Sequence, residues 1–73
     1  MDVSVRQRQI LSLIAEGCSD KEIARRLGVS ARTVDSHLQR LYLRYQVHTR
    51  AAMVAKWLLS GGSPDPVLAP RAS

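Results

Sequence analysis

The sequence predicts an all-α fold: one small domain of four helices over residues 1–60, followed by a disordered tail over residues 61–73. Three observations support this prediction. Apolar residues recur at helical spacing in four segments, each segment opens with Ser or Thr and is followed by a turn, and no stretch alternates as a strand would. The 73 residues are 45% hydrophobic and 23% charged, which is a globular composition of single-domain size.

The first helix is expected to begin at Ser4 and to end at Gly17. Ser4 and Gln7 have the spacing of a capping box, in which each side chain satisfies the backbone N–H of the other residue. Gly17 suits the left-handed conformation that commonly follows a helix. The apolar residues between these ends recur at helical spacing: Ile10, Leu11, Leu13 and Ile14.

The second helix is expected to begin at Ser19, which forms another capping box with Glu22, and to end at Gly28. Its buried stripe consists of Ile23, Ala24 and Leu27. About two turns of helix are not stable alone, so neighbouring helices must hold it.

The third helix follows a brief turn over residues 28–30, with Ser30 as its cap. One face is apolar and is predicted to be buried: Val34, Leu38, Leu41 and Tyr45. The opposite face is polar and net basic: Arg32, Asp35, Ser36, Gln39 and Arg40.

The fourth helix is expected to start near Thr49 and to stop at Gly61 and Gly62. We predict that its inner face consists of Ala51, Val54, Ala55 and Leu58. The outer side would then offer Ala52, Met53, Lys56 and Leu59, with Trp57 at the border. The Gly, Pro and Ser of residues 61–73 predict a flexible tail.

The charge distribution points to a polyanionic partner. The chain carries a net charge of +5, and residues 21–50 alone hold seven basic and two acidic side chains. A solvated, solubilising surface is the alternative explanation of such a basic stretch. The one cysteine excludes an intrachain disulfide and fits a reducing compartment, and no apolar run or signal peptide predicts a membrane location.

The second and third helices, joined by a short turn containing glycine, have the spacing of a helix-turn-helix. Gly28 permits the tight turn, Val29 plugs the junction, and the small Ala24 lets the helices approach. In this motif the first helix braces the second, whose polar face enters a major groove.

Residues 13–24, 27–30, 33–34 and 37–38 resemble the LuxR-type helix-turn-helix domain. Arg6 and residues 10–11 match its first helix, and five positions match its last: Val47, Arg50, Ala51, Val54 and Ala55. The resemblance covers about residues 3–59. This family domain is the C-terminal DNA-binding module of bacterial response regulators and quorum-sensing regulators, and it also occurs alone.

The resemblance implies sequence-specific binding of double-stranded DNA by a bacterial transcriptional regulator, with the third helix in the major groove. The implied backbone- and groove-contacting residues are Lys21, Arg32, Thr33, His37 and Arg40. The implied base-reading residues are Asp35, Ser36 and Gln39. The implied location is the bacterial cytoplasm, in association with the nucleoid. Further partners would be RNA polymerase or a regulatory domain of the same chain.

The family pairs two copies through its last helix, which implies a weak homodimer. We expect its interface at Ala52, Met53, Lys56 and Trp57. In the alternative, Met53 and Trp57 cover the small core and the domain binds as a monomer.

Four positions depart from the family pattern. Asp35 replaces the usual Lys, and either reads a base or pairs within its helix with Arg32 or Gln39. Gln46 replaces a Gly, at a cost of up to about 1 kcal/mol if the left-handed cap is kept. Tyr45 replaces Leu, and Asp20 replaces Asn.

Arg6 and Arg50 match signature positions of the family. At these positions we expect the arginine to bridge helices or to cap backbone carbonyls instead of contacting DNA. No paired carboxylates, nucleophile–base pair or phosphate loop predicts an enzyme, and no cofactor is expected. His37 and His48 lack metal-ligand spacing, and Cys18 lacks a resolving thiol. Two alternative functions stay open: a promoter-reading domain similar to that of a sigma factor, and a protein-interaction module that has lost DNA binding.

Overall fold

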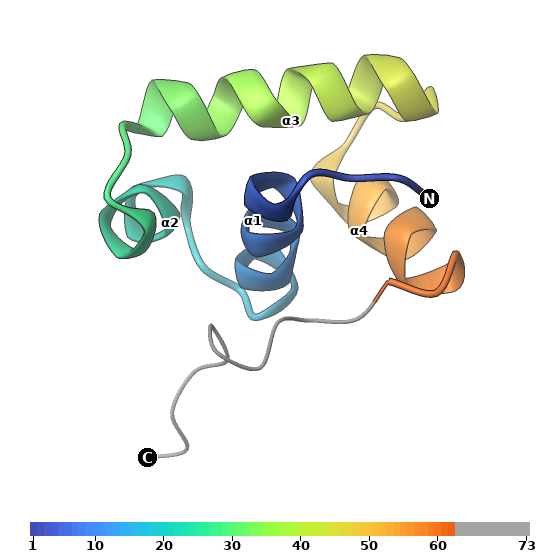
Figure 1. The fold of residues 1–73 in the computed structure, drawn as a ribbon, viewed down its shortest axis with the longest axis horizontal. Helices are drawn as coiled ribbons and strands as arrows, with labels where there is room; N and C mark the ends of the chain where they lie inside the picture. The colour runs from blue at the N-terminus through green and yellow to red at the C-terminus, as the bar shows by residue number, and fades with distance from the viewer. Residues whose placement is uncertain (63–73) are drawn as a thin grey trace.

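The structure, a computed structural model, describes residues 1–62 and contains four α-helices. They are α1 (Val5–Ala15), α2 (Asp20–Leu27), α3 (Ala31–Tyr45) and α4 (Arg50–Leu59). Residues 1–62 contain no strand, which confirms the all-α prediction for this part of the chain. Helices α1, α2 and α4 all pack against one side of α3, the longest helix (Figure 1). Apart from Gly61 and Gly62, the predicted tail lies outside the described residues.

The helix starts are fixed by side chains close in sequence. At α1, the Ser4 hydroxyl accepts from the Gln7 N–H at 3.1 Å, and Gln7 Oε1 accepts from the Ser4 N–H at 3.0 Å. Ser19 and Glu22 make the same reciprocal pair at α2, at 3.2 and 3.0 Å. Both predicted capping boxes are therefore confirmed, and each satisfies two backbone donors that the first turn leaves unpaired.

Each of the four helices is followed by a residue with positive φ, including Gly17 (φ 91°) after α1, as predicted, and Gly61 (φ 92°) after α4. Gly28 has φ 69° after α2, as its lack of a Cβ allows. Gln46 has φ 57° after α3, and within residues 1–62 it is the one non-glycine residue with positive φ. The predicted left-handed cap is thus kept without the glycine that usually occupies it.

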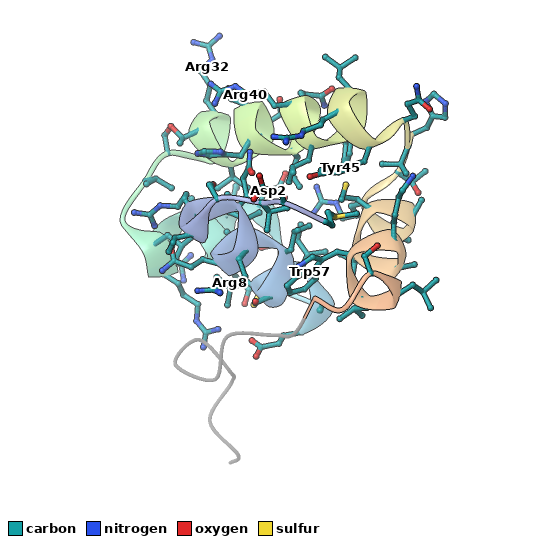
Figure 2. All side chains as sticks on the ribbon, turned by 45° about the vertical axis from the view of Figure 1, so that its right-hand side comes forward. Asp2, Arg8, Arg32, Arg40, Tyr45 and Trp57 are labelled. Atoms are coloured by element: carbon teal, nitrogen blue, oxygen red, sulfur yellow. The ribbon has the colours of Figure 1, made fainter. Side chains whose placement is uncertain are left out.

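The core lies between α3 and the other three helices. The predicted inner face of α3 is confirmed, because Val34, Leu38 and Leu41 are buried and Tyr45 is partly buried against them. The side chain of Trp57 lies between α1 and α4 (Figure 2) and is only 2% exposed. The other fully buried apolar side chains from α1 and α2 are Ile10, Leu11, Leu13 and Ile23.

The predicted orientation of α4 is wrong. Met53 is 0% exposed and, with Trp57, forms the buried face, whereas Ala51, Ala55 and Leu58 are exposed. Both stripes of this helix are apolar, so periodicity alone does not select one. Burying methionine and tryptophan removes far more apolar surface from water than burying two alanines does.

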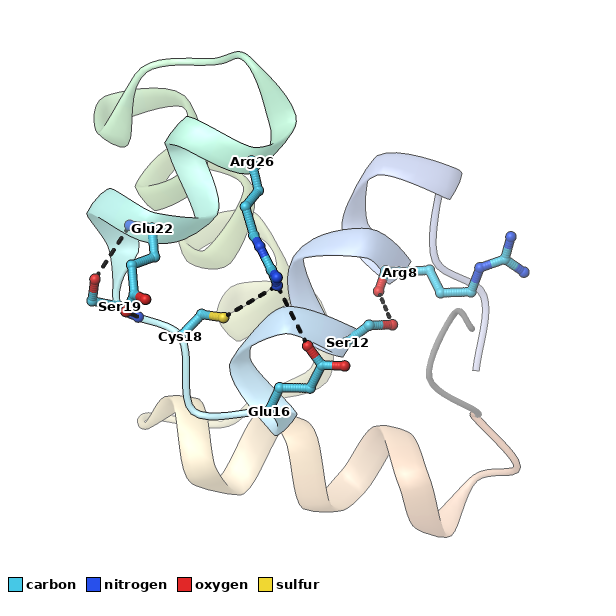
Figure 3. Close-up of polar contacts among 7 residues, drawn as sticks. All are labelled: Arg8, Ser12, Glu16, Cys18, Ser19, Glu22 and Arg26. Atoms are coloured by element: carbon cyan, nitrogen blue, oxygen red, sulfur yellow. Dashed lines mark hydrogen bonds and ion pairs between the residues drawn. The ribbon is translucent and has the colours of Figure 1, made fainter. Parts of the chain in front are cut away.

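Polar contacts between helices complete the scaffold. Arg6 Nη1 donates to the Leu27 carbonyl at 3.4 Å, and Arg50 Nη1 lies 2.8 Å from Asp20 Oδ1. These contacts agree with the bridging roles expected of both arginines. Arg26 lies 3.7 Å from the Glu16 carboxylate and 3.8 Å from Cys18 Sγ, and so ties α2 to the preceding turn (Figure 3).

The C-terminal end of α3 is held from two directions. Lys56 Nζ donates to the Tyr45 carbonyl at 3.0 Å, which satisfies an acceptor at the end of the helix. The Tyr45 hydroxyl donates to the Asp2 carbonyl at 2.5 Å, so the N-terminal segment is also fixed to this end. None of the helices in residues 1–62 has the length and apolar character needed to cross a membrane.

Candidate nucleic-acid interface

The outward face of α3 is polar and open. Burial of Val34, Leu38 and Leu41 turns the opposite face away from the core. Figure 2 shows Arg32 and Arg40 on the side of α3 away from the other helices. Four of the five residues predicted for this face are exposed and Ser36 is half-buried; the four are Arg32, Asp35, Gln39 and Arg40.

The N-terminal turn of α3 is held by its own cap. The Ser30 hydroxyl accepts from the Thr33 N–H at 3.1 Å and lies 3.0 Å from the Thr33 hydroxyl. Thr33 is half-buried, and its hydroxyl is thus engaged inside the turn. The first-turn N–H groups and the adjacent Arg32 make this end favourable for an anion.

His37 is half-buried on α3, within reach of the charge of Arg6 on α1. Burial lowers the pKa of its imidazole, and the charges of Arg40 and Arg6 lower that pKa further, which favours the neutral ring. Nδ1 is buried, and no partner within residues 1–62 hydrogen-bonds to it. Nε2 is therefore the ring nitrogen that can meet an external group.

Asp35 is exposed, and within residues 1–62 no hydrogen bond or ion pair joins it to Arg32 or Gln39. The pairing of Asp35 with Arg32 or Gln39 that the sequence suggested is therefore absent from the described residues. The half-buried Tyr42 lies about two turns further along the same flank. Burial raises the pKa of the Tyr42 phenol, and the charges of Asp20 and Asp35 add to this effect.

Lys21 is exposed in the first turn of α2, beside Asp20. It belongs to a different helix from the other predicted contact residues. The structure therefore places a cationic side chain at the start of the bracing helix and two more on the face of α3.

The predicted dimer residues do not form one exposed surface. Met53 and Trp57 are buried in the core, so the prediction that Met53 lies on the outer side with Trp57 at its border is wrong, and the alternative that both cover the core describes their position. Ala52 and Lys56 are exposed, but the Lys56 ammonium is engaged with the Tyr45 carbonyl.

An exposed apolar surface lies instead in a shallow groove between α1 and α4, which we call the α1–α4 groove. Its volume is about 470 Å³, and its lining residues are Ile14, Ala15, Arg50, Ala51, Val54, Ala55 and Leu58. Most of these side chains lie in stripes that the sequence predicted to be buried. The feature of the sequence that could have indicated this groove is the second apolar stripe of α4, which consists of the two exposed alanines and Leu58.

A short helix braced on a longer one through a glycine turn, with a basic polar face directed outward, defines the class of helix-turn-helix DNA-binding domains. The family model described as bacterial regulatory proteins, luxR family, matches residues 1–57. The chain therefore belongs to this family of DNA-binding transcriptional regulators.

Three relatives are named as transcriptional regulators. YhjB of Escherichia coli (strain K12) is 50% identical over 54 residues, which cover 71% of this chain and 27% of that protein. NarL of Mycobacterium tuberculosis (strain ATCC 25618 / H37Rv) is 46% identical over 54 residues, covering 74% and 25%. The monoamine regulon transcriptional regulator of Klebsiella aerogenes is 33% identical over 57 residues, covering 77% and 25%. The chain thus spans about a quarter of the length of these relatives.

Proposed function

We propose that this domain binds duplex DNA in a sequence-specific way, with α3 in the major groove, and that it regulates bacterial transcription without catalytic activity. The observation that carries the proposal is the exposed polar face of α3, from Arg32 to Arg40. This face takes no part in the core. Membership of the luxR family supports the same function.

Arg32, Arg40 and Lys21 are the residues that would contact phosphates. Such contacts supply most of the affinity and release counterions, so each one steepens the dependence of binding on salt. His37 would donate from Nε2 to the backbone, and Thr33 would line the groove. The base edges would face Asp35, Ser36 and Gln39.

The proposal is tested by selecting bound sites from random duplexes and titrating the selected site at several salt concentrations. Arg40→Ala should weaken binding to all sequences and reduce the salt slope by about one unit. Arg8→Ala is the matched control, since Arg8 is an exposed arginine on α1 (Figure 2) and should leave the slope unchanged. Absence of any selected sequence would contradict the proposal and favour a protein-interaction module.

We also propose a weak homodimer, formed through the α1–α4 groove. Ala51 and Ala55 are small enough for a second helix to approach closely, and Leu58 is 42% exposed beside them. One helix face is a limited interface, at or below the roughly 1,200 Å² of stable complexes. DNA with two half-sites would reinforce the pairing by holding both copies at high effective concentration.

The dimer is tested by Ala55→Glu, which places like charges across a two-fold axis. Cooperative binding to a duplex with two half-sites should vanish, while affinity for a single half-site stays nearly constant. Val5→Glu is the control, because Val5 is 64% exposed on α1 and outside the groove. Retained cooperativity in Ala55→Glu would place the pairing surface elsewhere.

The remaining partners follow from a role in transcription. We propose a cytoplasmic protein that associates with the nucleoid and acts with RNA polymerase or with a regulatory domain of its own chain. Crosslinking the regulator to chromosomal DNA in cells, with Arg40→Ala as the comparison, tests this location. Failure to recover chromosomal DNA with the parent would contradict it, and a lower recovery with Arg40→Ala is expected.

A further inference from the structure

The polar face of α3 carries one anion among its cations. Asp35 is the only acidic residue in this helix, and its side chain is exposed between the positions of Arg32 and Gln39. A carboxylate on a surface that meets DNA is unfavourable unless a cation neutralises it or a hydrogen-bond donor of the DNA meets it.

No group within residues 1–62 neutralises this carboxylate. The three ion pairs in this part of the chain join Arg26 to Glu16, Arg44 to Asp2 and Arg50 to Asp20. Arg50 is the cation whose charge acts on Tyr42 together with that of Asp35, and it already lies 2.8 Å from Asp20 Oδ1. Asp35 therefore keeps its full capacity as an acceptor.

We propose that Asp35 is a specificity-determining residue that selects a cytosine in the DNA half-site; this inference rests on the proposed function. An ionised carboxylate only accepts hydrogen bonds. In the major groove, cytosine presents the N4 amino group as a donor and no acceptor. Guanine presents two acceptors, thymine one, and adenine an acceptor beside its donor. Cytosine is thus the one base whose major-groove edge offers the carboxylate a donor and no acceptor that would repel it.

Gln39 lies one helical turn after Asp35 and should select a base of its own. Its amide both donates and accepts, which matches N6 and N7 of adenine. Four residues of helix rise by about 6 Å, and base pairs are stacked about 3.4 Å apart. The selected half-site should therefore contain a cytosine and an adenine about two base pairs apart, while Arg32 and Arg40 hold the flanking phosphates.

The experiment compares the parent with Asp35→Ala and Asp35→Asn on the site selected by the parent, with each of the four base pairs placed in turn at the cytosine position. The parent should prefer cytosine by about 5-fold to 150-fold over the other bases. Asp35→Ala should lose this preference at that base pair alone. Asp35→Asn should prefer adenine there, because an asparagine amide pairs with N6 and N7.

Gln39→Ala is the matched control: it should lose discrimination at the adenine position and keep the preference for cytosine. If the parent binds selectively but both Asp35 variants keep its preferences, the inference is wrong while the proposed function stands. A uniform gain in affinity for all four bases in Asp35→Ala would also overturn it, because Asp35 would then only repel phosphates. A parent that selects no sequence contradicts the proposed function itself.

Discussion

Replacement of Met53 by alanine tests the packing of α4 most directly. The Met53 side chain is 0% exposed and belongs to the core together with Trp57. Truncation to alanine removes the buried thioether and leaves a cavity that the surrounding helices fill only in part. Losses of this kind amount to about 2–5 kcal/mol of unfolding free energy.

The size of the domain makes this loss decisive. A core of this size supplies about 3–5 kcal/mol of net stability. Met53→Ala should therefore remove half or more of it and lower the melting temperature by roughly 10 °C or more, at about 4–8 °C per kcal/mol. This expected loss of stability depends only on the burial of Met53, so it can be measured without DNA and without a second copy of the chain.

Urea unfolding followed by far-ultraviolet circular dichroism measures the effect. Ala52→Gln is the control, since Ala52 is exposed on the same helix and the change should stay within about 0.5 kcal/mol. If Met53→Ala unfolds at the same urea concentration as the parent, the assigned face of α4 is wrong. Met53 would then lie on the outer side of α4, as the sequence predicted.

Three further changes test local features by thermal or acid unfolding. Gln46→Gly should raise stability by about 0.5–1 kcal/mol, because glycine adopts φ 57° without steric cost; an unchanged melting temperature would contradict this. Ser19→Ala should cost about 1 kcal/mol near neutral pH by removing the α2 cap. The pKa of Glu22 is lowered chiefly by the Ser19 backbone N–H, which alanine keeps, and next by the Ser19 side chain, which alanine removes. The side-chain contribution is present above the ordinary carboxyl range and is lost as pH falls through the lowered pKa, so the gap between parent and Ser19→Ala should narrow in acid. A constant gap would exclude a contribution of Glu22 to it. Gly62→Ala should destabilise the domain, because a Cβ at Gly62 would overlap the Trp57 indole ring; a stability equal to that of the parent would refute this close approach.

The helix boundaries could be predicted because their causes are local. Ser4 with Gln7 and Ser19 with Glu22 lie three residues apart, and the capping hydrogen bonds they form need no other part of the chain. The buried face of α3 was equally accessible. Its apolar residues occupy one stripe and its charged residues the other, so only one orientation buries the apolar side chains.

The orientation of α4 could not be predicted in this way. Its sequence has two apolar stripes, one with large side chains and one dominated by alanine. The choice depends on the space that α1 and α3 leave, which is a property of the assembled core. The same limit applies to the contacts of Tyr45 with Asp2 and Lys56, which join residues 43 and 11 positions apart.

The contacts that hold α3 explain why its outward residues can vary. The helix is fixed by three buried side chains, by the Ser30 cap at its start and by Lys56 on its last carbonyl. None of these contacts uses Arg32, Asp35, Gln39 or Arg40. A change from the usual lysine to Asp35 therefore costs the fold little, and its consequences fall on whatever meets that face. Because the scaffold and the outward face use separate side chains, substitutions on this face should alter recognition while leaving the unfolding free energy nearly unchanged.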